Sequence, residues 1–162
     1  MSQPEHLEGL ESVPALDGEE AAPEELVGTL PDVVRQRVVL LAADAVGRIP
    51  ADSLPTALKR VASFAPGRRA KLAGSQIAGV LESDKTFRGH VARQVRLDAP
   101  AMAEALDAGV APPAADPVEV AAFAYLMRPD GWSQLVAQAA SAVDAERDLE
   151  QSRQTAGQLD RA

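Results

Sequence analysis

Catalysis by a nucleophile or a zinc ion needs side chains that are scarce in this chain. It has no Cys and two His, His6 and His90. A Ser/His/Asp set needs a base within reach of its nucleophile, and the usual zinc sites need several Cys or His ligands. His90 lies between Arg88 and Arg93, which is typical of a surface position on a basic helix. These chemistries are therefore disfavoured.

The acidic residues outside the N-terminal region stand mostly singly, each at the start of a predicted helix. A Mg²⁺-dependent nuclease would instead need several carboxylates that converge from different elements. Capping of helix N-termini accounts for isolated Asp residues. We therefore predict no enzymatic activity, no metal and no cofactor. The predicted capping residues are Asp32, Asp52, Asp84, Asp98 and Asp116.

Cations are concentrated in segment 67–75 (GRRAKLAGS). This segment is not a Walker motif, because its Lys does not follow a second Gly and no strand precedes it. Arg68, Arg69 and Lys71 fall in the first turn of a predicted helix, where the dipole disfavours cations but free main-chain N–H groups bind anions. The pattern predicts a phosphate or nucleic-acid contact. Alternatively, these cations pair with carboxylates elsewhere or are simply solvated.

Two further sets of cations could extend this surface. Lys59 and Arg60 lie one short helix earlier, and a second basic group follows on the next helix. Aromatic side chains, on which bases could stack, make up only 3% of the chain, so RNA binding is expected to be weak and salt-dependent. The predicted nucleic-acid or phosphate-binding residues are Lys59, Arg60, Arg68, Arg69, Lys71, Arg88, Arg93 and Arg96.

Charge is strongly segregated along the chain. Residues 1–30 carry eight carboxylates and no Lys or Arg, whereas residues 48–96 carry ten cations and three carboxylates. Such segregation bears on partners rather than on fold. Residues 1–28, called the acidic leader below, are predicted to be disordered, because their scattered apolar residues cannot offset the entropy of ordering. Tethered to the same chain, the leader would compete for the cations.

The remaining sequence predicts an all-α fold. Apolar residues make up 46% of the chain and are mainly Ala, Val and Leu, which suits close helix packing. Apolar positions recur at helical spacing between Pro, Gly and Asp punctuation, and no alternating strand pattern occurs from residue 31 onward. We expect about six short helices and one long C-terminal helix. The expected helices begin near residues 31, 53, 66, 84, 99, 117 and 132.

The last helix changes character along its length. Its first half is apolar, but beyond residue 144 only Leu149, Ala156 and Leu159 continue the stripe. We predict a helical domain over residues 29–143 and a projecting helix or weak coiled segment over 144–162, which could bind a protein partner or self-associate. A frayed tail is the alternative. With neither a secretory signal nor an apolar run long enough to span a membrane, the protein is expected to be cytoplasmic.

Four segments resemble the N-terminal helical region of actinobacterial NYN-domain proteins, described as predicted RNA-binding proteins with a PIN-like nuclease domain. They are 30–39 (LPDVVRQRVV), 58–74 (LKRVASFAPGRRAKLAG), 116–122 (DPVEVAA) and 125–132 (YLMRPDGW). The resemblance covers about residues 29–150 and implies a role in RNA metabolism. In that family clustered acids of the NYN domain are thought to hold a metal for RNA cleavage. No position here matches those acids, so no catalytic residue is carried over.

Together these observations predict a non-catalytic helical module associated with RNA binding. The main alternative is a protein–protein interaction scaffold that does not bind nucleic acid. A helix-turn-helix DNA regulator is a third class, although no recognition helix stands out.

Overall fold

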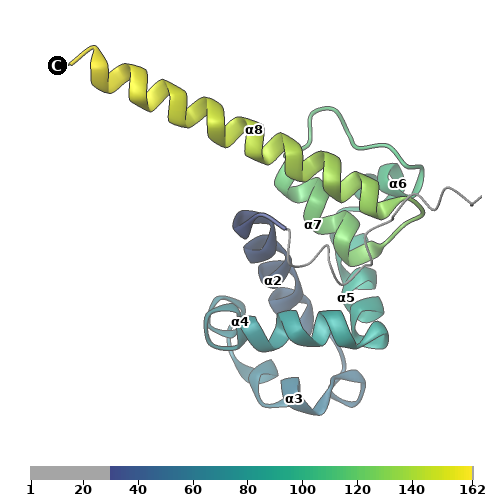
Figure 1. The fold of residues 1–162 in the computed structure, drawn as a ribbon. Helices are drawn as coiled ribbons and strands as arrows, with labels where there is room; N and C mark the ends of the chain where they lie inside the picture. The colour runs from purple at the N-terminus through teal and green to yellow at the C-terminus, as the bar shows by residue number, and fades with distance from the viewer. Residues whose placement is uncertain (1–29, 162) are drawn as a thin grey trace, which may run out of the picture.

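The computed structural model describes residues 30–161 of the chain. Within them every regular element is an α-helix or a 3-10 helix and no strand occurs, which confirms the all-α prediction (Figure 1). The predicted disorder of the acidic leader lies outside the described residues. The elements are α2 (Asp32–Val46), η1 (Ala51–Ser53), α3 (Thr56–Lys59), η2 (Val61–Ser63), α4 (Pro66–Ser83), α5 (Lys85–Asp98), α6 (Pro100–Asp107), α7 (Pro117–Met127) and α8 (Trp132–Leu159).

Helix α7 forms the centre of the core. Its residues 120–127 are all buried, and it packs against α8, α2 and α5. The sequence of α7 is apolar on every side, which is the pattern of a helix enclosed by neighbours. Helix α4 packs on the other side of α2 and carries α3 and η2 at its N-terminal end (Figure 1).

The short helix predicted after Asp52 is divided into η1, α3 and η2. Leu54 has an extended backbone with ψ 140° because it precedes Pro55, and a residue before proline is disfavoured in the helical region. Helix α3 therefore restarts only after Pro55. The result is a compact turn of short pieces, from which Leu54, Leu58 and Val61 are buried.

Two of the predicted helix caps are confirmed. Asp84 Oδ1 accepts a hydrogen bond of 2.9 Å from Phe87 N–H, and Asp116 Oδ1 accepts one of 2.8 Å from Val118 N–H.

Asp32 and Asp52 lie in the first turns of α2 and η1, as predicted for helix starts, but neither forms a capping hydrogen bond, and the predicted cap at Asp98 is wrong. Helices α2 and α6 and the 3-10 helix η1 begin without a side-chain cap. Asp98 instead ends α5 and binds Arg48 through both of its oxygens, at 2.6 and 2.7 Å. This contact between distant parts of the chain takes the place of capping.

Helix α8 has two different halves. Leu135, Val136, Ala139 and Val143 are buried, whereas every residue from 144 to 161 is exposed. Figure 1 shows α8 lying along α7 and then extending well beyond the rest of the fold. None of the described helices is both long and apolar enough to cross a membrane.

Candidate nucleic-acid interface

Arg69, predicted to contact a ligand, is instead a structural residue. It is only 3% exposed, and its guanidinium donates to four carbonyl oxygens, those of Ala43, Val61 (3.2 Å), Ala62 (2.9 Å) and Phe64 (2.5 Å). Burial lowers the pKa of Arg69. Because every arm of the guanidinium is used to join α2, η2 and α4, the prediction of a ligand contact at Arg69 is wrong.

Arg88 is a second buried cation. It is 7% exposed and donates from Nη1 to the carbonyl oxygen of Leu81 at 2.6 Å. Burial, and then the neighbouring Arg128, lower the pKa of Arg88. The predicted contact of Arg88 with nucleic acid is therefore also wrong, since the group is enclosed at the junction of α4 and α5.

The burial of both arginines was not predicted, although their helical phase could have indicated it. Arg69 stands four residues before Ala73 and eight before Ile77, which places it on the buried stripe of α4. Arg88 likewise precedes Val91 by three residues and Val95 by seven on α5.

Arg96 is partly exposed but is neutralised. It makes a two-pronged ion pair with Asp107, with N···O distances of 2.5 and 3.0 Å. This contact raises the pKa of Arg96 and lowers the pKa of the Asp107 carboxyl. Because Asp107 neutralises it, Arg96 has little free charge to offer a polyanion.

Arg93 is the exposed arginine of the second predicted basic group, which also contains Arg88 and Arg96. It makes no ion pair within the described residues, while its neighbour His90 is half-buried on the same helix. With Arg88 enclosed and Arg96 paired, α5 does not present the continuous basic face that the sequence indicated.

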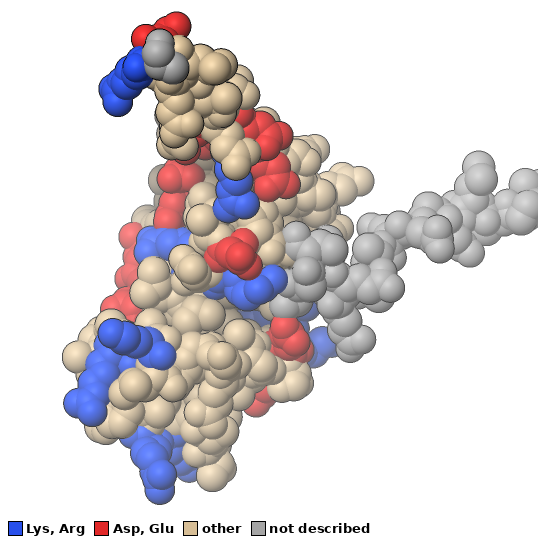
Figure 2. All heavy atoms as spheres, turned by 60° about the vertical axis from the view of Figure 1, so that its left-hand side comes forward, with Lys and Arg blue, Asp and Glu red and all other residues tan. Residues whose placement is uncertain are grey.

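The other four predicted residues lie on neighbouring elements, at the end of α3 and in the first two turns of α4, which contact each other. Lys59, Arg60, Arg68 and Lys71, called the cationic end below, are exposed and form no ion pair with any described residue. They belong to segment 53–81, which contains five Lys or Arg and no Asp or Glu. Figure 2 shows Lys and Arg at this end, away from the tip of α8, with little acidic surface between them.

Arg68 adds an aromatic contact to the cationic end. Its guanidinium carbon lies 5.0 Å from the centre of the Phe64 ring, within the range of a cation–π interaction. Phe64 is half-buried, so its ring fixes Arg68 rather than offering a free stacking platform.

The aromatics with polar groups are also occupied. Arg128 lies 4.5 Å from the centre of the Trp132 ring and 5.1 Å from that of Tyr125. It has the left-handed backbone conformation (φ 49°) that ends α7. Tyr125 is 2% exposed, and burial raises its pKa. Bases therefore have no access to the Tyr125 ring. The Trp132 ring already contacts the Arg128 guanidinium, which occupies a position where a base could stack.

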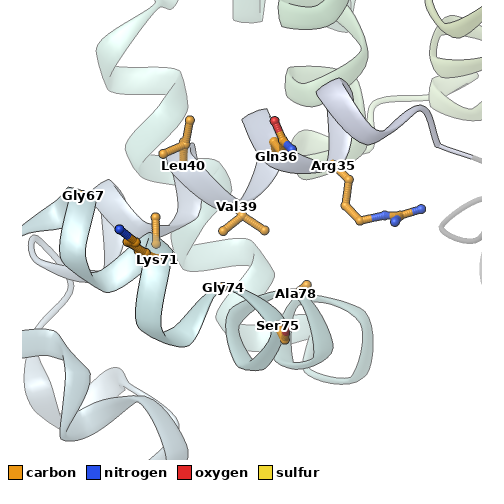
Figure 3. A pocket seen from close by; sticks show the side chains of 10 residues that line it. Arg35, Gln36, Val39, Leu40, Gly67, Lys71, Gly74, Ser75 and Ala78 are labelled. Carbon is orange, nitrogen blue, oxygen red and sulfur yellow. The ribbon is translucent and has the colours of Figure 1, made fainter.

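A groove between α2 and α4 was not predicted. It has a volume of about 450 Å³, and the described residues that line it include no carboxylate. In Figure 3 Arg35 and Lys71 lie at opposite ends, with Val39 between them. A Cβ on Gly74 would lie 3.3 Å from Val39 Cγ1, so the glycine lets the two helices approach closely. Leu40, an apolar residue beside Val39 in the sequence that the fold leaves exposed, is the feature that could have indicated this groove.

Within residues 30–161 no group of three or more His, Cys, Asp or Glu is arranged to hold a metal ion. Comparisons with protein families, with curated protein sequences and with solved structures found no match. The resemblance to the helical region of NYN-domain proteins therefore remains a prediction, as does a cytoplasmic location.

Proposed function

We propose that this chain is a non-catalytic helical module that binds single-stranded RNA weakly through the phosphate backbone. The observation that carries the proposal is the cationic end, where four exposed Lys and Arg side chains lie in a segment without carboxylates. Phosphate contacts from such residues supply affinity without sequence preference. The resemblance to NYN-domain proteins supports RNA over other polyanions.

The position of the cationic end favours a ligand that runs past it. Lys59 and Arg60 close α3, whereas Arg68 and Lys71 lie in the first two turns of α4. Because no aromatic side chain at this end is free for stacking, base contacts add little, and the affinity depends steeply on salt.

Fluorescence anisotropy with a labelled oligouridine of about 12 nucleotides tests the proposal. This length is within the roughly 4–16 nucleotides that a single-strand-binding domain of the OB-fold class contacts. The variant Arg60→Glu/Arg68→Glu should weaken binding at least about tenfold at low salt, because two phosphate contacts become repulsive. The matched control Arg147→Glu/Arg153→Glu changes the net charge equally but on the exposed half of α8. Equal losses in the two variants would contradict a localised site.

A protein-interaction scaffold is the second candidate, and the groove between α2 and α4 is the observation that favours it. An apolar groove holds a partner by burial, which salt does not weaken. Retention of a protein partner at about 0.5 M NaCl, where the Debye length is only a few Å, together with no RNA retention at low salt, would decide for the scaffold.

A further inference from the structure

We infer that the groove between α2 and α4 is a docking site for the chain's own acidic leader, with residues 24–27 (EELV) seated in it. The inference goes beyond RNA binding and does not depend on it.

The described chain enters the fold at one end of the groove. Leu30 is buried and lines a small cavity of about 40 Å³ that shares Arg35, Val39 and Ala78 with the groove. Arg35 also donates from Nη2 to the Leu30 carbonyl oxygen at 3.3 Å. The residues just before Leu30 therefore start at one end of the groove.

The leader and the groove have complementary charges. The leader carries eight carboxylates and no cation, whereas no carboxylate lines the groove among the described residues. Lys71, at the far end, forms no ion pair with a described residue, so its ammonium group is available to a carboxylate of the leader. Glu82 lines the cavity at the near end, so carboxylates of the leader are favoured only further along, toward Lys71.

The length of the groove fits the last residues of the leader. From Ala78 to Lys71 the groove follows seven residues of α4, about 10 Å of helix. Six residues of extended chain, from Leu30 back to Glu24, span up to about 20 Å, which is more than enough. In this arrangement Leu26 and Val27 cover the apolar floor around Val39, and Glu24 and Glu25 reach Lys71. The docked segment would then compete with RNA for Lys71, because both use the same ammonium group.

Disulfide trapping in the full chain tests the inference, because the protein has no Cys of its own. Ala22→Cys provides the probe in the leader. Combined with Gly67→Cys, at the far end of the groove, it can form a disulfide that we call the far bond. Combined with Gly79→Cys, beside Ala78 and near the point where the chain enters, it can form the near bond. An added Cβ meets no other group within 4 Å at either glycine.

A docked leader should form the far bond about tenfold faster than the near bond, because docking raises the effective concentration only along the groove. An undocked leader would give the opposite order or equal rates, since residue 79 is nearer to Leu30 in the fold. Equal rates, or a faster near bond, would overturn the inference and leave the groove to another partner.

A charge reversal provides the matched control. Lys71→Glu should slow the far bond about fivefold, the effect of replacing one exposed ion pair by repulsion. Lys85→Glu, at an exposed lysine on α5, should change its rate less than about twofold. Identical behaviour of the two variants would also overturn the inference. No RNA is present in this assay, so its outcome is independent of the RNA titration.

Discussion

Replacement of Arg69 by Met is the most informative test of the fold. Met keeps much of the length and apolar stem of the side chain but removes the guanidinium, which donates to four carbonyl oxygens. One of these, Ala43 O, lies in the last turn of α2. The Gly47 N–H, four residues on, bonds Ala45 O instead. Arg69 therefore caps α2 at its negative end, where a cation is most favourable.

The expected cost follows from the groups left behind. Hydrogen bonds from a charged donor each contribute about 1.5–3 kcal/mol, but removal of the charge also removes its desolvation penalty, so the terms do not add. Four carbonyl oxygens lose their donor, and each buried acceptor left unsatisfied costs about 1–3 kcal/mol, so with partial relaxation the total cost is about 3–5 kcal/mol. For a domain of this size that is a large share of a total stability of about 5–15 kcal/mol.

Urea unfolding followed by far-UV circular dichroism measures this change directly. Arg69→Met should lower the free energy of unfolding by about 3–5 kcal/mol. The adjacent control, Arg68→Met, removes an exposed cation and should change it by less than about 1 kcal/mol. Gly47→Ala provides an independent test, because its Cβ would lie 3.1 Å from Arg69 Nη2 and displace the guanidinium. A loss below about 1 kcal/mol for Arg69→Met would refute the role assigned to this residue.

Three further predictions concern other parts of the fold. Gly79→Ala and Gly89→Ala should each raise the free energy of unfolding by about 0.5–1 kcal/mol in urea unfolding, since both glycines are exposed within helices and have open space around a Cβ; destabilisation would contradict the described helices. The pKa values of Asp98 and Asp107 are lowered from 3.8 by hydrogen bonds from their arginine partners, so their stabilisation is present above pH 3.8 and is lost as the pH falls through the lower folded values. The double variant Asp98→Asn/Asp107→Asn should therefore be less stable than wild type at pH 7, by at most about 1 kcal/mol per exposed pair, and the gap should close on acidification; a constant gap from pH 7 to 2 would contradict the linkage. Deletion of residues 145–162 should leave the urea midpoint almost unchanged, because residues 144–161 are all exposed; a large loss of stability that depends on protein concentration would show that this part of α8 is buried in an oligomer.

The sequence predicted helix positions well because local signals determine them. Asp84 and Asp116–Pro117 define the starts of α5 and α7 through contacts within three residues of the cap. Asp98 shows the limit of such signals. It precedes a helix in a pattern typical of a cap, yet it binds Arg48, 50 residues away. Whether an Asp caps or pairs depends on which cation the tertiary fold brings near, and spacing alone does not contain that information.

The candidate site was predictable only in part. Counting cations treats Arg68 and Arg69 as equivalent neighbours, but one is exposed and the other is buried on a different face of α4. Arg68 contacts the Phe64 ring at the surface, while Arg69 lies on the stripe of Ala73 and Ile77. The phase of the apolar stripe predicts that Arg69 is buried and Arg68 is not. The carbonyl groups that bind Arg69 are brought together only when η2 packs near α2, and the sequence does not show this.

This division of the cations changes the expected salt dependence of RNA binding. For single strands the slope of log K against log salt is about −0.7 for each neutralised phosphate. The eight residues predicted from sequence would give a slope of about −6, whereas the four of the cationic end give about −3. Anisotropy titrations at several NaCl concentrations distinguish these values. A slope near −6 would mean that Arg69, Arg88 and Arg96 leave their carbonyl and carboxylate partners to meet RNA, which contradicts the structural role of the first two. A slope near −3 that falls to about −1.5 in Arg60→Glu/Arg68→Glu assigns the polyanion contact to the cationic end alone.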